Sequence, residues 1–324
     1  MMRHKMGAGL LIGILLLSLV TLSSFSASYP EKPVNIVVQF APGGSTDVLA
    51  RMIAAGLEKI FNQRFVIINK PGAGGEIGYL AVANSEPDGY TIGFTNTTSH
   101  LVIPLTKPEG TTYSLDDFVQ IACIAIDPGI LVVKADSPFQ TIQDYIDYAK
   151  ENPNKITVTH DGPGGDDYLA IKYIENAANI KLKYVQYEGN APAMVDLLGG
   201  HVASGALNVS QVYTLIKAGN LRALAIMDDS RIPELAGVPT FKELGMDVIS
   251  NASRGISGPV GIPDEILKTL ADAIGKVVLE DPDFTSRAKE MLLPIKFKPL
   301  DEYKELLRTE YRKLEKIWEE DPWL

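Results

Sequence analysis

The stretch VNIVVQFAPGGSTDVLAR, residues 34–51, joins an apolar run to Pro-Gly-Gly and then to a segment with helical spacing. Such a run predicts a buried strand, and the polar residues after the glycines are typical of a helix start. Glycines let the backbone approach a ligand, and the free N–H groups of a helix start attract anions. The stretch therefore predicts an α/β fold with an anion-binding loop. One of Ser45, Thr46 and Asp47 is also expected to cap the helix.

Strand-like and helix-like segments alternate through most of the chain, which is typical of parallel sheets flanked by helices. The strand candidates are residues 34–40, 64–70, 90–96, 122–134, 155–160, 182–187 and 221–227. The helix candidates between them are residues 47–61, 167–178, 192–198 and 210–218. The end of the chain differs, because residues 263–280 and 300–320 predict two helices with little strand between them.

Two further glycine loops share the design of the first. PGAGGE (71–76) follows the second strand candidate, and DGPGGDD (161–167) follows the strand that ends at His160. Ligands of open α/β sheets lie at the carboxyl ends of the strands, where all three loops are expected. The glycine loops contain no basic side chain, so we expect backbone N–H groups to do most of the recognition.

Composition and motifs argue against several classes of protein. The 324 residues carry a net charge of -10 and show no basic cluster, which argues against nucleic acid as a partner. GAGGEIG (72–78) is a poor relative of the dinucleotide fingerprint, and neither a phosphate loop nor a G-x-S-x-G elbow occurs. We expect no catalytic residue, cofactor or metal site, and we interpret the single Cys123 as a buried small hydrophobe.

The first 28 residues have the pattern of a secretory signal peptide. Arg3 and Lys5 precede an apolar run over residues 10–20, and small polar residues follow. The alternative is an uncleaved membrane anchor, for which the run is short. We expect cleavage, a periplasmic or extracytoplasmic location and a mature chain that does not span a membrane. Cleavage removes two basic residues and changes the net charge from -10 to -12.

The chain resembles the substrate-binding proteins of the tripartite tricarboxylate transporter system, the Bug family of extracytoplasmic solute receptors. The matching segments are YPEKPVNIVVQFAPGGSTDVLAR (29–51), VIINKPGAGGEIGYLAVANSEPDGYTI (66–92), DPGILVVKADSPFQTIQDYIDYAK (127–150), VQYEGNAPAMVDLLGGHV (185–202), LRALAIMDDSRIPELAGVPTFKELG (221–245) and GPVGIP (258–263). The resemblance implies a two-lobed periplasmic binding protein of the type II-like, Venus flytrap kind, with a mainly parallel sheet in each lobe. Residues 29–126 and 228–324 would form lobe one, and residues 127–227 would form lobe two.

The resemblance also implies a function and a site. The protein would capture a di- or tricarboxylate, an amino acid or an aromatic acid and deliver it to membrane permease subunits; we expect a monomer. Lobe one would contribute the ligand-binding residues Gly44, Ser45, Thr46, Asp47, Gly74, Gly75, Thr95, Asn96 and Thr97. Lobe two would contribute Gly162, Gly164, Gly165, Asp166, Asp167, Tyr187, Glu188, Gly189, Asn190 and Asn208.

One loop departs from the family pattern. Family members often have a hydroxyl residue in place of Gly165 and a histidine in place of Tyr168, whereas this loop continues as Asp166-Asp167. Carboxylates do not attract a carboxylate, so these aspartates either cap the helix or hold an ammonium or hydroxyl group of the ligand. The second alternative predicts a ligand with a hydrogen-bond donor, as in an amino acid. A metal at these aspartates is less favoured, since few oxygen ligands surround them in sequence.

Two other classes remain open from the sequence. The same glycine loops suit a phosphate- or nucleotide-dependent α/β enzyme, which would bind a phosphorylated cofactor and show turnover. A sensor subunit that reports ligand to a membrane kinase would differ only in its docking partner.

Overall fold

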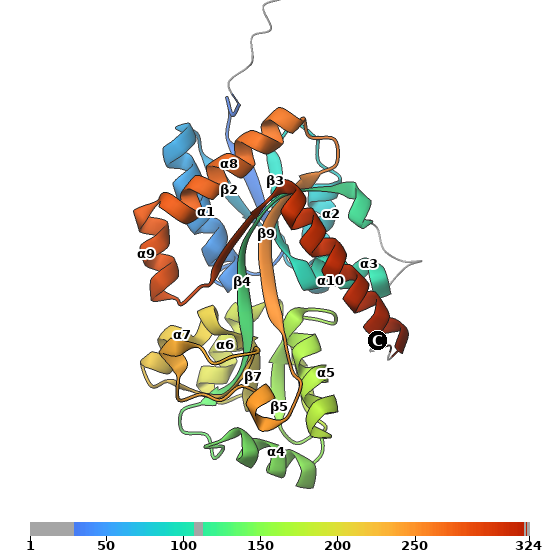
Figure 1. Ribbon diagram of the computed structural model, residues 1–324, viewed down its shortest axis with the longest axis vertical. Coiled ribbons are helices and arrows are strands. Elements are labelled where there is room, and N and C mark those ends of the chain that lie inside the picture. Colours follow the sequence, from blue (N-terminus) through green and yellow to red (C-terminus); the bar gives the residue numbers. More distant parts are fainter. Residues whose placement is uncertain (1–28, 107–112, 321, 323–324) are drawn as a thin grey trace, which may run out of the picture.

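The computed structural model describes residues 29–106, 113–320 and 322, so the expected signal peptide lies outside the described residues. The chain forms two lobes, and strands β4 (Phe118–Lys134) and β9 (Asn251–Pro259) cross the boundary between them (Figure 1). Within the described ranges, no helix is both long and apolar enough to cross a membrane.

The sheet of lobe one has the order β2-β1-β3-β9-β4, with β10 also paired to β4. Strands β2, β1 and β3 are parallel, whereas β9 is antiparallel to both β3 and β4. The sheet is therefore mixed, although its first three strands are parallel as predicted. The remaining strands of this lobe are β1 (Val34–Val38), β2 (Phe65–Asn69), β3 (Thr91–Asn96) and β10 (Ile295–Pro299).

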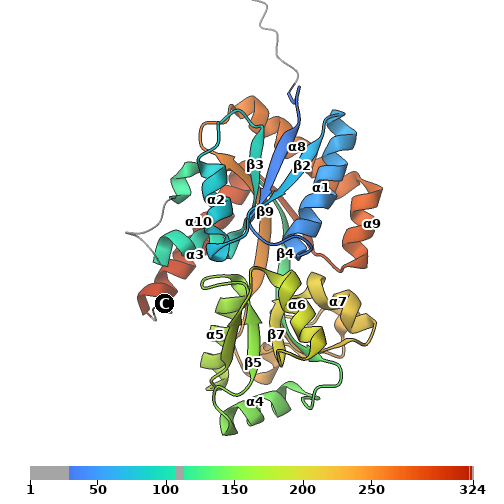
Figure 2. The same cartoon turned by 180° about the vertical axis from the view of Figure 1, so that it is seen from behind.

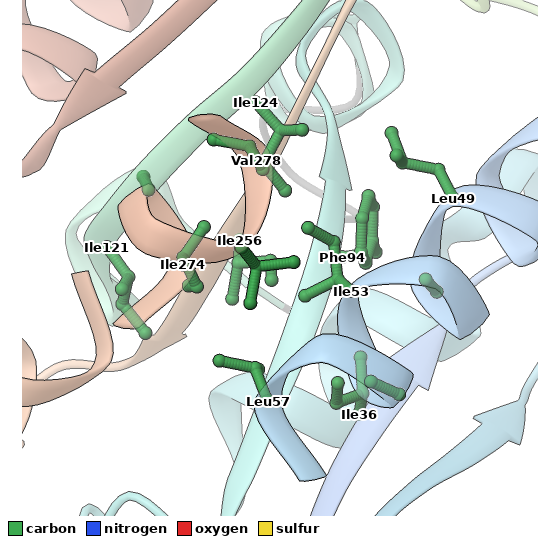
Figure 3. Close-up of a cluster of buried hydrophobic side chains, with 14 of the residues drawn as sticks. Ile36, Leu49, Ile53, Leu57, Phe94, Ile121, Ile124, Ile256, Ile274 and Val278 are labelled. Carbon is green, nitrogen blue, oxygen red and sulfur yellow. The ribbon is translucent and has the colours of Figure 1, made fainter. Parts of the chain in front are cut away.

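Helices α1 and α8 cover one face of this sheet, and α10 lies across the other (Figures 1 and 2). Leu49, Ile53 and Leu57 recur along one side of α1 and pack on strand residues such as Ile36 and Phe94 in the largest core cluster (Figure 3). The helices of lobe one are α1 (Ser45–Phe61), α2 (Glu76–Ala83), α3 (Thr97–Thr106), α8 (Asp264–Glu280), α9 (Pro282–Glu290) and α10 (Leu300–Glu320).

Lobe two has a second sheet that shares β4. Strand β5 is parallel to β6 and β7, and β4 is antiparallel to β7 and β8. Its other strands are β5 (Thr157–His160), β6 (Lys183–Gln186), β7 (Ser204–Asn208) and β8 (Leu221–Met227). Its helices are α4 (Ile142–Glu151), α5 (Asp166–Ala178), α6 (Asn190–Gly199) and α7 (Val209–Lys217).

The segment after β8 bears on where the chain returns to lobe one. Phe241 and Val248 are fully buried in the core cluster of lobe two, and Thr240 pairs with Ile226 of β8. We therefore propose that the second crossing lies at the start of β9, near residue 251, rather than at residues 227–228.

The C-terminal helix contacts both lobes. Tyr303 and Leu307 of α10 pack with Val102 of α3 in lobe one, and the same cluster contains Leu314 of α10 and Leu169 of α5 in lobe two. We expected this helix to pack on lobe one, and its last turns also pack against lobe two. The free Cys123 is buried, as predicted.

Candidate functional site

The glycine loops of the two lobes meet at the boundary between them. Gln211 at the start of α7 donates from Nε2 to Ser45 Oγ of α1 at 2.7 Å. The backbone N–H of Ala41 in lobe one donates to the carbonyl oxygen of Glu188 in lobe two at 3.3 Å. Gly162 faces Gly74 so closely that a Cβ on Gly162 would lie 3.1 Å from Gly74 Cα. The lobes are thus closed against each other.

A small cavity lies where these loops converge. Its volume is about 10 Å³, which is room for about one water molecule. An organic acid therefore reaches this place only if the lobes separate first. The cavity is lined by Phe40, Gly44, Ser45, Thr46, Asn96, Asp161, Gly189, Asn190, Gln211 and Arg254.

The first turn of α1 lines this cavity through Ser45 and Thr46. Gly44 is the N-cap residue and makes no side-chain cap bond, so the expectation that Ser45, Thr46 or Asp47 caps the helix is wrong. Asp47 instead accepts hydrogen bonds from the backbone N–H of Gly43 at 2.9 Å and from the guanidinium of Arg51. It thereby fixes the shape of the Pro-Gly-Gly loop, and the N–H groups of the first turn remain available to an anion.

The corresponding helix of lobe two, α5, is arranged differently. Gly165 is its N-cap residue, and no side chain caps the helix, so the capping alternative for Asp166 and Asp167 is wrong. A Cβ on Gly165 would lie 2.7 Å from Asp161 Cγ, so the Asp161 carboxyl group fills the space beside the helix start. The space beside the start of α5 is therefore occupied by a carboxyl group of the protein itself, that of Asp161.

Asp166 links the two lobes. One of its carboxylate oxygens accepts from Asn96 Nδ2 of lobe one at 3.0 Å, and the other accepts from Asn208 Nδ2 at 3.0 Å. Both amide partners are among the residues that the family resemblance implied for the site. In this closed form Asp166 joins the lobes rather than lining the cavity.

Arg254 of β9 is a cavity-lining residue that the sequence analysis missed. Its guanidinium donates to Asp127 Oδ2 at 2.7 Å and to Asn208 Oδ1 at 2.6 Å, and its Nε has no partner among the described residues. The Arg254 and Asp127 side chains are only 1% and 0% exposed. A fixed guanidinium therefore adds positive charge to a site where we had expected backbone groups to do most of the recognition.

Burial and crowding change the acidity of the nearby carboxyl groups. Burial, followed by the charge of Asp166, raises the pKa of Asp161 to about 8. Burial and then Asp166 also raise the pKa of Asp167 well above its usual value. Burial raises the pKa of Asp127 against the opposing effect of Arg254. No group of three or more His, Cys, Asp or Glu residues in the described part of the chain is arranged to hold a metal.

The other residues implied for the site lie around the cavity without lining it. Thr95 shares a hydrogen bond with Ser257 at 2.9 Å, and the hydroxyl group of Tyr187 donates to Asp196 at 2.7 Å. Thr97 lines a neighbouring pocket of about 70 Å³. Of the residues implied for the site, those that line the cavity itself are Gly44, Ser45, Thr46, Asn96, Gly189 and Asn190. The ligand-binding role of all of them stays a prediction.

A larger groove, of about 760 Å³, lies elsewhere, between the segment after β8 and the α9–β10 region. It contains none of the glycine loops and none of the buried aspartates Asp161, Asp166 and Asp167. We favour the small cavity as the site because the helix starts and the buried charges converge there.

Two α/β lobes whose sheets share the long strand β4 and that close over a polar cavity define a two-lobed binding protein. The model of the tripartite tricarboxylate transporter family receptor matches residues 49–320. The chain is 33% identical over 245 residues to Protein BugT of Bordetella pertussis, covering 75% of each. The chain belongs to this receptor family, as its resemblance to the Bug proteins had implied.

Solved structures agree with this assignment. The periplasmic binding protein BugD matches with a TM-score of 0.85 and 28% identity, over 90% of this chain and 98% of that one. The R. palustris protein Rpa4515, solved with adipate, matches with a TM-score of 0.84 and 28% identity, over 90% of this chain and 97% of that one. The two-lobed α/β fold predicted from the sequence is confirmed.

Proposed function

We propose that this protein captures a small organic acid between its lobes outside the cytoplasmic membrane and delivers it to a permease. The observation that carries the proposal is the uncapped first turn of α1, which faces a cavity that both lobes enclose. A carboxylate at that turn accepts hydrogen bonds from backbone N–H groups and interacts favourably with the helix dipole. The hydroxyl groups of Ser45 and Thr46 line the same place.

The proposed mechanism is hinge closure. Strands β4 and β9 cross the boundary, and small backbone rotations there would separate the loops that now touch. The ligand enters the open form, contacts loops of both lobes and so favours the closed form. The closed form would then dock on permease subunits, a partner that the receptor family implies.

The relatives support the chemical class and the compartment. Adipate, the ligand solved with Rpa4515, is a dicarboxylate, and BugD is described as a periplasmic binding protein. The expected signal peptide agrees with that location. We propose no catalytic step for a chain of this receptor family.

A thermal-shift screen followed by calorimetry tests the proposal. Organic acids are expected to raise the melting temperature and nucleotides are not. Gly44→Asp places a carboxylate at the α1 cap, where aspartate is a favoured residue, and is expected to abolish binding without loss of stability. Gly237→Asp is the matched control, because no atom lies within 4 Å of a Cβ at Gly237. Undiminished binding by Gly44→Asp would contradict the assignment of the site.

A further inference from the structure

The residues that line the cavity include both free acceptors and a helix start. Asp161 Oδ1 and Asn96 Oδ1 are buried and have no partner among the described residues, and both side chains line the cavity. Asn96 Nδ2 donates to Asp166, so the orientation of this amide is fixed and its oxygen is the atom left free. Asn190 Oδ1, also unpartnered, belongs to a third lining residue. The helix start at Gly44 supplies the donors.

Ionisable carboxyl groups outnumber cations around the cavity. Asp161 lines it, while Asp166 contacts the lining residue Asn96 and Asp167 contacts Asn190. These three carboxyl groups are at most 6% exposed. Arg254 is the cation that faces them, and it is already paired with Asp127. When these carboxyl groups are ionised, a ligand that brings only negative charge adds repulsion in a place that water cannot screen, whereas a bound cation favours their ionised form.

We propose that the ligand carries an ammonium group beside its carboxylate, as an amino acid does, with the ammonium held by Asp161, Asn96 and Asn190. The carboxylate would lie at the first turn of α1. An ammonium has three N–H donors, which equals the number of free side-chain oxygens on these residues. This proposal rests on the proposed function and refines its ligand class. It also moves the ammonium from Asp166 and Asp167, where the sequence had suggested it, to Asp161.

In the alternative chemistry, Asp161 is protonated and donates a hydrogen bond to the ligand instead of accepting one from it. Burial and Asp166 raise the pKa of Asp161 to about 8, so a protonated Asp161 would donate a hydrogen bond to a ligand carboxylate. The groups that face Asp161 are Asp166, Asp167, Arg254 and Tyr79, and His160 precedes it in the chain. Affinity for an ammonium ligand is expected to rise from pH 6 to pH 8, because Asp161 must be ionised. Affinity that depends on a protonated Asp161 would fall over that range.

Calorimetry with matched ligands tests the proposal. After a screen of the protein amino acids, the tightest binder is compared with the same acid carrying hydroxyl or hydrogen in place of its amino group, as in L-aspartate, L-malate and succinate. The amino acid is expected to bind about 10- to 100-fold more tightly, since charged hydrogen bonds to a buried carboxylate are lost in the other two. Equal or tighter binding of the deaminated acid would overturn the proposal, as would affinity that falls between pH 6 and pH 8.

The isosteric variant Asp161→Asn isolates the proposed contact. It is expected to weaken binding of the amino acid at least tenfold. Binding of the deaminated acid is expected to stay equal or become tighter, because one negative charge is removed. Asp147→Asn on the exposed face of α4 is the matched control and is expected to bind like the wild type. If Asp161→Asn retains full affinity for the amino acid, this inference is overturned while the proposed function stands. If no organic acid of any kind binds the wild type, the proposed function fails as well.

Discussion

Gly164→Ala is expected to block closure of the lobes and to weaken ligand binding. Gly164 belongs to the loop before α5 in lobe two, and Val102 belongs to α3 in lobe one. A Cβ on Gly164 would lie 3.0 Å from Val102 Cβ and closer still to Val102 Cγ1, well inside ordinary contact. Val102 is fully buried and its β-branched side chain has few alternative rotamers, so the overlap is relieved mainly by separating the lobes.

The magnitude follows from two separable costs. Gly164 has a φ of +81°, and alanine pays about 1–2 kcal/mol for such a backbone in the open and closed forms alike. That cost lowers stability and leaves affinity unchanged. Overpacking, in contrast, arises only in the closed form and typically costs about 1–3 kcal/mol. The dissociation constant should therefore rise about 5- to 150-fold.

The assay is calorimetry with the tightest ligand from the screen, together with the radius of gyration from small-angle scattering. Gly219→Ala is the control, because it has a φ of +73° and no atom within 4 Å of its Cβ. Val102→Ala in the Gly164→Ala background should restore affinity by removing the obstructing methyl groups. Wild-type affinity in Gly164→Ala, or failure of Val102→Ala to restore binding, would refute the reasoning that binding requires the Gly164 loop to approach Val102.

Three further outcomes are expected. Arg254→Met leaves Asp127 buried without its partner and should lower the free energy of unfolding in urea by about 3–5 kcal/mol; a loss below about 1 kcal/mol would contradict the importance of this pair. Because burial raises the pKa of Asp161 from 3.8 to about 8 and that of Asp167 in the same direction, the folded protein keeps protons that the unfolded chain releases. The unfolding free energy without ligand should therefore fall as the pH rises from about 4 to about 8, by at most about 1.4 kcal/mol per pH unit and group; a flat profile of melting temperatures would argue against it. Leu314→Ala should cost about 2–5 kcal/mol in the same urea titration, and a neutral result would mean that the end of α10 contributes little.

Much of the fold could be predicted because its strands and helices have clear apolar patterns. The expected strands at residues 34–40, 64–70 and 90–96 correspond to β1, β2 and β3. Strand β9 was missed because its sequence, NASRGISGP, has the composition of a loop. Several of its residues are small, and at Gly255 a neighbour packs against the backbone itself: a Cβ there would lie 2.6 Å from the ring of Tyr303.

The candidate site was predicted in part. The Pro-Gly-Gly loop before α1 follows directly from the sequence pattern, whereas the uncapped start of α1 does not, because a capping side chain was expected there. Arg254 could not be placed, because it lies in the missed strand and its role depends on a partner 127 residues away. A signal was nevertheless present, since Asp127 interrupts a long apolar run and a buried carboxylate of this kind needs a counter-charge. The position of the Asp161 carboxyl group beside α5 could not be predicted, because residue spacing in the sequence does not determine where side chains lie.

The packing of α10 on both lobes has a practical consequence for labelling. Because Leu314 shares a buried cluster and a small pocket with Leu169 of lobe two, the end of this helix lies at the place where the two lobes would separate. A fluorophore attached near the end of α10 would therefore sense its surroundings change as the protein opens, without any label in the cavity. A bulky fusion partner at the same end would bias that motion, so purification handles belong at the other end of the mature chain.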